Sequence, residues 1–400
     1  MDVLPEERER HGAPGRTTDE PVGIVAHQVL SELTHTPGSP FEGWTFDAIR
    51  NGEYSITTTI DPKIEAILTR AAHGTADRSP MSGQPSNLQA AAVVIEPGTG
   101  RVLAYYGGPE AYGADYAGVY RGDDGQLAGF GAHPPGGSFL VYTLAAALRA
   151  GHSLDSRWQW TPHEQVGRDP ANPVRNTGIC WSSPDGRTCT LRDALIYSLA
   201  VPFYDVTVAV GVPALLTMVR DLGITALWSD GGVRVDLTTA DLSDTEGKFG
   251  FEAGIGQNWV TVVDQATAMA TLAAGGVPAP THFVREVRKG TEVLYREPEP
   301  TGEAVLTPDQ VAAVTDTLTA RTGTNGLAIT TGAWEYAAGL GNSDAWSLGY
   351  TSELAIAVWV GNRDEAQPLI DKDGVWVWGS GLPTQILRQV VEEASSRLFG

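Results

Sequence analysis

Five side chains in or beside three short segments of this sequence are candidates for a nucleophile or a general base: Ser138, Ser198, Ser343, His133 and Asp344. A serine hydroxyl becomes a strong nucleophile only when a neighbouring base accepts its proton. One helical turn after Ser138 the chain carries Val141, which cannot accept a proton. His133 would act as a general base only if it projected into a cleft, and a loop histidine usually forms local hydrogen bonds instead. The sequence therefore offers candidates but no clear pair of nucleophile and base.

The segment around Ser138 has the local pattern that places a nucleophile at the N-terminus of a helix. Residues 134–137 are a Pro/Gly turn, and residues 138–149 are apolar on nearly every face, which predicts a helix buried in the centre of a domain. The start of such a helix is positively polarised and favours developing negative charge. Gly137, in the first turn, has no side chain, and we expect Ser138 to cap the helix.

Residues 135–140, Pro-Gly-Gly-Ser-Phe-Leu, resemble the first motif of the transpeptidase domain of class A penicillin-binding proteins, Pro-Gly-Ser-Ser-Phe-Lys. In that family the first serine is acylated and the lysine one turn later handles its proton. The resemblance places Gly137 at the serine and Leu140 at the lysine. Ser138 matches the second serine, which is not the nucleophile in that family. The resemblance thus implies that the acyl-transfer pair is missing.

The second motif of that family, Ser-x-Asn, corresponds to residues 194–203. Ser198 keeps the serine, whereas Ala200 stands where the family has the asparagine. Without the lysine and the asparagine, Ser198 loses the partners with which the family's serine exchanges hydrogen bonds. We expect its hydroxyl to cap backbone groups at a helix terminus instead.

The third motif, Lys-Thr-Gly, binds the substrate carboxylate on the edge strand that faces the nucleophile in that family. Asp-Ala-Trp at 344–346 resembles the residues that follow this motif, which places the motif within residues 337–346. Gly339 or Leu340 then stands where the family has the lysine, and Gly341 follows them. The cleft that these motifs would surround is expected to be lined by Gly137, Leu140, Tyr142, Ser198, Ala200, Leu340 and Asn342.

The resemblance implies an α+β fold of the penicillin-binding-protein and β-lactamase type, with a central antiparallel sheet flanked by helices and an all-helical subdomain. The residues agree, since β-branched runs at 91–96 and 101–106 flank a Pro-Gly-Thr-Gly turn and predict a hairpin. We divide the chain into a flexible arm and linker, residues 1–53, and a transpeptidase-like domain, residues 54–400. Within the domain we expect sheet at about 88–110 and 280–362, a helical part at about 135–275 and a C-terminal helix at 382–399.

The formal net charge of −21 disfavours binding to nucleic acid or to anionic membranes. The sequence has no apolar run of 18 residues, so we expect no membrane span in this chain. Cys180 and Cys189 lie in a turn-rich stretch; two separate thiols remain an alternative, but a similar cysteine pair in actinobacterial class A members favours a disulfide. No metal site or cofactor is expected.

Three hypotheses about function remain open. The first is a catalytically degenerate, non-acylating domain that serves cell-wall synthesis as a scaffold or as a cleft for a peptide or peptidoglycan-related ligand, with wall-synthesis proteins as partners. The second is a repurposed enzyme that uses the cleft for other chemistry on a small apolar molecule in a biosynthetic pathway. The third is a transpeptidase inactivated by engineering. The cysteines favour an extracytoplasmic location, whereas the N-terminus, if Met1 is the natural start, favours the cytoplasm.

Overall fold

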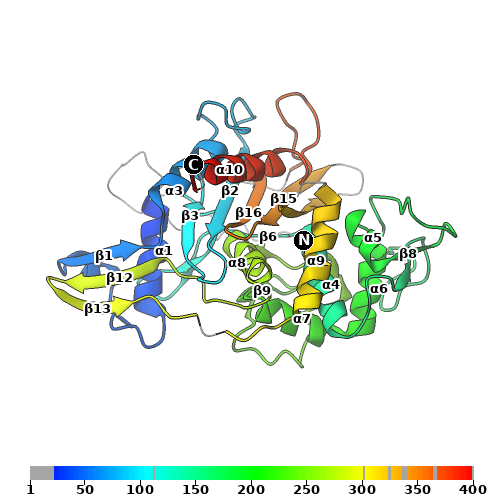
Figure 1. Cartoon of the computed structure of the whole chain (residues 1–400), viewed down its shortest axis with the longest axis horizontal. Coiled ribbons are helices and arrows are strands. Elements are labelled where there is room, and N and C mark those ends of the chain that lie inside the picture. The colour runs from blue at the N-terminus through cyan, green and yellow to red at the C-terminus, as the bar shows by residue number, and fades with distance from the viewer. Residues whose placement is uncertain are drawn as a thin grey trace.

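A five-stranded antiparallel sheet lies at the centre of the computed structural model of this protein (Figure 1). The structure describes residues 22–110, 113–300, 302–322, 326–335, 341–363 and 367–398. The strand order is β14-β15-β16-β2-β3, which leaves β14 at one edge. The strands are β14 Ala328–Glu335, β15 Asn342–Tyr350, β16 Ala355–Asn362, β2 Leu88–Ile95 and β3 Val102–Tyr106. The α+β class and the hairpin of β2 and β3 are thereby confirmed.

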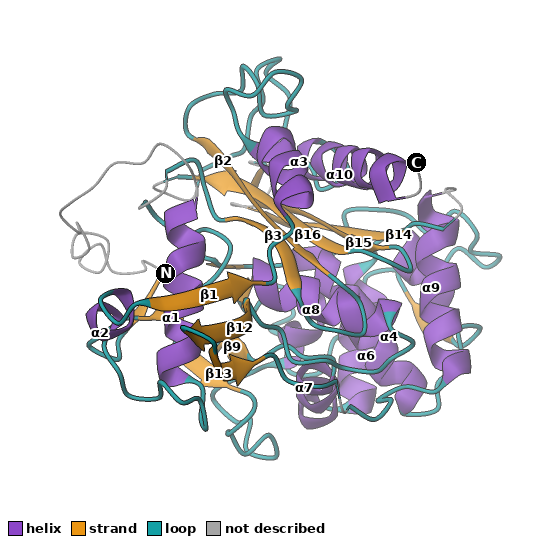
Figure 2. Ribbon diagram, turned by 60° about the vertical axis from the view of Figure 1, so that its left-hand side comes forward, coloured by secondary structure: helices purple, strands orange, loops and turns teal. Residues whose placement is uncertain are grey.

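Both faces of this sheet are covered, which explains its almost continuously apolar sequence. Every residue of β2 is buried, and its side chains alternate between two separate apolar clusters. Helices α3 (Pro62–Ala72) and α10 (Leu382–Leu398) pack on one face, and α8 (Val262–Ala273) packs on the other (Figure 2). The expected C-terminal helix is therefore present and belongs to the outer layer.

The helical part surrounds α4 (Leu140–Arg149), nine of whose ten residues are buried. This helix contacts α5, α6, α7 and α9, so it forms the core of the subdomain that the sequence predicts. The other helices are α5 Leu191–Ile196, α6 Ala200–Val210, α7 Val212–Asp221 and α9 Pro308–Thr322, with 3₁₀ turns η2 Gly136–Phe139 and η3 Phe251–Ile255. Short strands are β4 Tyr120–Arg121, β5 Leu127–Ala128, β6 Ala132–His133, β7 Arg157–Gln159, β8 Thr188–Thr190, β9 Ala226–Trp228, β10 Arg234–Asp236 and β11 Val260–Thr261.

Two expectations about the chain outside this core need correction. Strands β12 (Val284–Lys289) and β13 (Glu292–Arg296) fall in the range expected for the central sheet, but they form a hairpin that pairs with β1 (Tyr54–Thr58) in a separate three-stranded sheet. Helices α1 (Val22–His35) and α2 (Phe46–Arg50) bury apolar side chains in the main core. From residue 22 onward, the segment that we expected to be a flexible linker is therefore folded against the domain.

No single helix within the described residues is both long and apolar enough to cross a bilayer. Helices α6 and α7 reach that length and composition only as a pair, and they are bent by 100° at their junction. Both contribute buried side chains to the helical part, which accounts for their apolar sequence.

Cys180 and Cys189 form a disulfide, as the resemblance implies. The bond closes a loop between residues nine apart in sequence, and both cysteines are buried. Replacing both cysteines by alanine is expected to lower the free energy of unfolding by about 2–3 kcal/mol, because the unfolded chain regains loop entropy. Urea denaturation should show this loss, and dithiothreitol should produce a similar loss in the wild type but none in the variant. A variant as stable as the wild type would contradict a stabilising role for the bond.

Glu65 joins α3 to the sheet, because its carboxylate accepts hydrogen bonds from Tyr105 N and Thr69 Oγ1. Burial raises the pKa of Glu65 to about 7. The folded state therefore holds the Glu65 proton more tightly than the unfolded state does. The contribution of this proton to the free energy of unfolding is complete below about pH 4.5 and is lost as the pH rises through 7. Glu65→Gln keeps the shape without the charge and should stabilise the protein by on the order of 2 kcal/mol at pH 8 and little at pH 5. Chemical denaturation at both pH values tests this, and an equal effect at the two would contradict it.

Candidate active site

The start of the central helix lies directly against the edge strand of the sheet. The turn η2 packs on β14, and two glycines make this close approach feasible. Gly136 has φ of 51°, and a Cβ atom there would overlap Ala333 O. A Cβ atom on Gly332 would likewise overlap Ser138 N. Glycine at both positions therefore lets two backbones meet where other residues would separate them.

Gly137 differs from these two glycines. A Cβ atom there would lie 3.6 Å from Thr331 O and 4.0 Å from Ser198 Cβ, which is ordinary van der Waals contact. Gly137 is also half-buried, whereas its neighbours Gly136 and Ser138 are buried. The position therefore has room for a side chain and has contact with solvent.

Within the described part of the segment predicted to carry the third motif, Trp346 contacts the turn before this helix, because its Nε1 donates to Pro134 O, but Gly341 and Asn342 lie elsewhere. Gly339 and Leu340 lie outside the described residues. Gly341 lies beside Pro368 and Trp376, and Asn342 begins β15, the second strand of the sheet. The strand that faces η2 is β14, so the register expected from the sequence is wrong for Gly341 and Asn342.

Three residues expected in the cleft are instead packing residues. Leu140 is 1% exposed and lies in the main apolar core. Tyr142 is fully buried, and its hydroxyl donates to Gln265 Oε1 on α8. Asn342 is 3% exposed, and its Nδ2 donates to Val377 O. These side chains stabilise the domain from inside and do not line an open surface.

Ser198 lies opposite Gly137, in a conformation that differs from the expected helix cap. Its φ is 51°, and its Oγ is buried without a hydrogen-bond partner. The expectation that this hydroxyl caps backbone groups is therefore wrong. Thr330 on β14 has a second buried and unpartnered hydroxyl. Because buried hydroxyls normally have a partner, each of these two indicates a place where an interaction has been lost or is supplied by another molecule.

Two other motif positions, Ala200 and Ser138, offer no catalytic group. Ala200, half-buried, is the first residue of α6 and offers only a methyl group. Ser138 is fully buried; its Oγ donates to Pro135 O at 2.9 Å and accepts from Gln265 Nε2 at 3.3 Å. Its hydroxyl therefore neither caps the helix nor has a base beside it.

The structure brings His133, Asp344 and Ser343 together, but below the surface. His133 stacks on Trp359 with ring centroids 3.8 Å apart, and its Nε2 donates to Tyr116 O at 3.0 Å. Asp344 accepts hydrogen bonds from Trp359 Nε1 and from the Ser343 hydroxyl. The Ser343 proton thus points to a carboxylate that also accepts a hydrogen bond from Trp359, and the imidazole of His133 donates to Tyr116 O instead of contacting the serine.

Burial disfavours an ion pair between His133 and Asp344. His133 Nδ1 lies 3.9 Å from Asp344 Oδ1. Burial lowers the pKa of His133 to about 3 and raises the pKa of Asp344 to about 6. Both shifts favour the neutral forms, so the imidazole is neutral at pH 7. A neutral, stacked and hydrogen-bonded histidine is a packing residue.

Sequence reasoning missed Arg321, in the last turn of α9. Its Nη2 donates to Thr331 Oγ1 at 2.6 Å, and its Nη1 lies 3.3 Å from Leu195 O. Leu195 O also accepts from Ser198 N, so the guanidinium adjoins the turn that holds Ser198. Burial lowers the pKa of Arg321 to about 10, which leaves it charged at neutral pH. The sequence signal was only a cation near a helix end, which is common for structural reasons.

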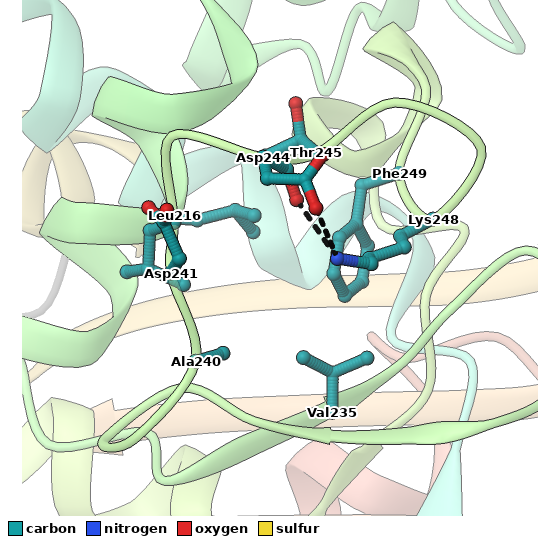
Figure 3. Close-up of a pocket in the computed structure, with 9 residues that line it drawn as sticks. Leu216, Val235, Ala240, Asp241, Asp244, Thr245, Lys248 and Phe249 are labelled. Carbon is teal, nitrogen blue, oxygen red and sulfur yellow. Dashed lines mark hydrogen bonds and ion pairs between the residues drawn. The ribbon is translucent and has the colours of Figure 1, made fainter.

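Two pockets formed by described residues lie away from this site. One, of about 10 Å³, is lined by Leu216, Val235 and Phe249, with Lys248 bound to Asp244 across its rim (Figure 3). It has room for about one water molecule. The other lies between α3 and α10, beside Arg70 and Glu393. In the part of the chain that the structure describes, no group of three His, Cys, Asp or Glu residues is arranged to hold a metal ion.

An antiparallel sheet with a buried helix whose start abuts the edge strand, beside a serine from the helical part, is the arrangement of a penicillin-binding-protein transpeptidase domain. The family model described as "Penicillin binding protein transpeptidase domain" matches residues 90–366. The chain is also 31% identical, over 94% of its length, to Penicillin-binding protein 1A of Mycolicibacterium smegmatis and to that of Mycobacterium tuberculosis. The chain therefore belongs to the penicillin-binding-protein transpeptidase family.

Solved structures support the same assignment. The penicillin-binding protein PonA1 from Mycobacterium tuberculosis superposes with a TM-score of 0.76 at 27% identity, over 94% of this chain and 92% of that one. PonA1 in complex with penicillin V superposes with a TM-score of 0.75 at 27% identity, over 94% and 93% of the two chains. The chain spans only 45% and 43% of the lengths of the two curated relatives.

Proposed function

We propose that this chain is a penicillin-binding-protein domain that does not become acylated and that binds a peptide or a protein partner in cell-wall synthesis. The observation that carries the proposal is the open position at Gly137, which has room for a side chain but has none. One turn later stands Leu140, buried in the apolar core, and Ala200 offers a methyl group where an amide is needed.

The edge strand supports the same proposal. Residues 330–332, Thr-Thr-Gly, are the part of β14 nearest to Gly137 and Ser138. We take them as the counterpart of Lys-Thr-Gly, since that motif belongs on the strand that faces the nucleophile. Thr330 then stands where the family has the lysine. Its side chain offers a buried hydroxyl without a hydrogen-bond partner in place of the ammonium group.

The energetic consequence is large. Removing one member of a nucleophile and base pair costs several powers of ten in rate, and removing more of the same unit adds little. About 5–8 kcal/mol of transition-state stabilisation is absent at 1.36 kcal/mol for each tenfold change in rate. Among the described residues, neither Ser138 nor Ser198 has a lysine, histidine or carboxylate within hydrogen-bonding distance. No observation favours different chemistry in the old site.

An extracytoplasmic location fits this proposal. The disulfide forms and persists in an oxidising compartment. Relatives described as peptidoglycan D,D-transpeptidases, 25% identical over 58% of this chain, point to the same setting.

The binding part of the proposal is tested with a short acetylated peptide that ends in D-alanyl-D-alanine. Calorimetry should detect saturable binding, while an assay for free D-alanine detects no release. Release of D-alanine at a rate above that of the buffer would contradict the absence of acyl transfer. Absence of both binding and release would contradict a peptide-binding cleft.

A further inference from the structure

Residues 175–181 present every second side chain to solvent. Arg175, Thr177, Ile179 and Trp181 are exposed, whereas the three residues between them are half-buried or buried. A period of two is the pattern of a segment with one side against the protein and the other side in water. Trp181 is 78% exposed and Ile179 is 49% exposed, so the outer side carries two large apolar side chains. This part of the chain lies at the periphery of the molecule, beside α5, α6 and β8 (Figure 1).

The inner side of the segment is fixed to the protein. Asn176 donates from its Nδ2 to Trp160 O at 2.7 Å, and its Oδ1 accepts from Val201 N at 2.8 Å. Gly178 lies against the backbone of the same region, since a Cβ atom there would be 3.1 Å from Tyr197 O. The segment therefore packs on the turn that precedes α6, and this turn also contains Ser198 of the candidate active site.

The exposed tryptophan stands at the start of a closed and internally bonded loop. The disulfide between Cys180 and Cys189 joins the two ends of this loop. Inside it, the carboxylate of Asp185 accepts four hydrogen bonds from residues 183–188. A partner that binds Trp181 does not have to order the loop, which lowers the entropic cost of association.

The charge of this region is opposite to that of the whole protein. Residues 157–192 contain five arginines and three acidic residues, a formal balance of +2, whereas the whole chain carries −21. Arg175 and Arg187 are exposed, and within the described residues neither guanidinium group has a hydrogen bond or an ion pair. Both lie beside Trp160, whose N–H donates to Arg187 O and whose carbonyl accepts from Asn176, the neighbour of Arg175. Two free cations thus flank the exposed apolar side chains.

We infer that residues 175–187 form a docking surface for an acidic segment of a partner protein, with Trp181 and Ile179 as its apolar anchors. Tryptophan and arginine are the residues that most often dominate binding energy in protein interfaces. Charge selects the occupant, because acidic side chains complement Arg175 and Arg187. The net charge of −21 opposes a second copy of this chain and an anionic bilayer. The inference rests on the partner-binding part of the proposed function and specifies the chemistry of that partner.

The test uses a fluorescein-labelled acidic peptide, Asp-Glu-Leu-Asp-Glu-Phe-Asp-Glu-amide, and its neutral analogue, in which asparagine and glutamine replace the acids. Fluorescence anisotropy with the whole chain should show saturable binding of the acidic peptide, about tenfold tighter than that of the analogue. Trp181→Ala and Arg187→Gln should each weaken binding about fivefold or more. Trp376→Ala, which removes another exposed tryptophan outside this surface, should leave the affinity unchanged.

Four results would overturn the inference. The first is absence of saturable binding, and the second is equal binding of the two peptides. The third is a loss in Trp376→Ala as large as that in Trp181→Ala, because general attraction to an acidic protein would then explain nothing specific. The fourth is a different occupant, shown by tighter binding to phosphatidylglycerol vesicles or by self-association in sedimentation that Trp181→Ala abolishes.

The disulfide supplies a readout that a merely charged patch would not give. Replacing Cys180 and Cys189 by alanine leaves Trp181 and both arginines in place, yet it should weaken binding several-fold, because the loop must then be ordered by the partner. An unchanged affinity would overturn the preorganised surface. Circular dichroism and the unfolding midpoint of each variant show whether a loss of binding reflects a loss of structure.

The proposed function is tested separately on the same samples. Loss of peptide binding with an unchanged intact mass after β-lactam treatment contradicts the docking surface alone. An increase in mass with peptide binding retained contradicts the non-acylating function and leaves the docking surface in place.

Discussion

Gly136→Ala is expected to lower the free energy of unfolding by about 3–4 kcal/mol, while Gly137→Ala, one residue later, changes it by about 0.5 kcal/mol or less. The first substitution puts a Cβ atom onto Ala333 O and into a left-handed backbone conformation. The overlapping atom belongs to the backbone of β14, so no side chain can rotate away. The second substitution puts a methyl group in ordinary contact with Thr331 and Ser198.

Urea denaturation of the two variants measures this difference directly. Both variants add one methyl group to a glycine of η2, and the two positions differ in the space that β14 leaves and in the backbone conformation of the glycine. Equal losses in the two variants would show that η2 and β14 are not held together as the structure places them. A large loss in Gly137→Ala alone would contradict the open position on which the proposed function depends.

Leu140→Lys has the second large expected effect, a loss of about 3–5 kcal/mol at pH 7. Leu140 is 1% exposed in the main apolar cluster, so an ammonium group there leaves water for an apolar surrounding. Burial lowers the pKa of a lysine, so the folded state binds fewer protons than the unfolded state. Stability should therefore recover as the pH rises from 7 toward 10.

Leu140→Met is the matched control, because it preserves volume and polarity and should cost less than about 1.5 kcal/mol. Denaturation of both variants at pH 7 and pH 10 gives the comparison. A lysine variant as stable as the methionine variant at pH 7 would mean that partners for the ammonium group persist around α4. Such a result would contradict the role of Leu140 as a core packing residue.

The sequence predicted those features that depend on local pattern. The Pro/Gly turn at 134–137 and the apolar run after it specify a buried helix, and the turn at 97–100 specifies a hairpin, because each depends on neighbouring residues alone. The local pattern could not show that α1 packs against apolar partners in the core, so a segment that we expected to be a flexible linker is a folded helix.

The edge strand and Arg321 depend on tertiary pairing. Counting back from Asp-Ala-Trp placed the third motif next to β15, whereas sheet pairing sets Gly332 opposite Trp346 and makes β14 the edge strand. Arg321 and Thr331 belong to different elements, and only the packing of α9 on β14 brings them into contact. Spacing along the chain predicts neither the pairing of β14 with β15 nor the contact between Arg321 and Thr331.

The intact mass of the protein after prolonged incubation with a broad β-lactam tests the central claim most directly. The mass should stay unchanged, both for the wild type and for Gly137→Ser, which restores a hydroxyl but leaves Leu140 where a proton acceptor is required. Fragmentation locates any adduct that does form. A stoichiometric adduct on the wild type, attached to Ser138, Ser198 or another side chain beside Gly137, would contradict the claim that this transpeptidase domain does not become acylated.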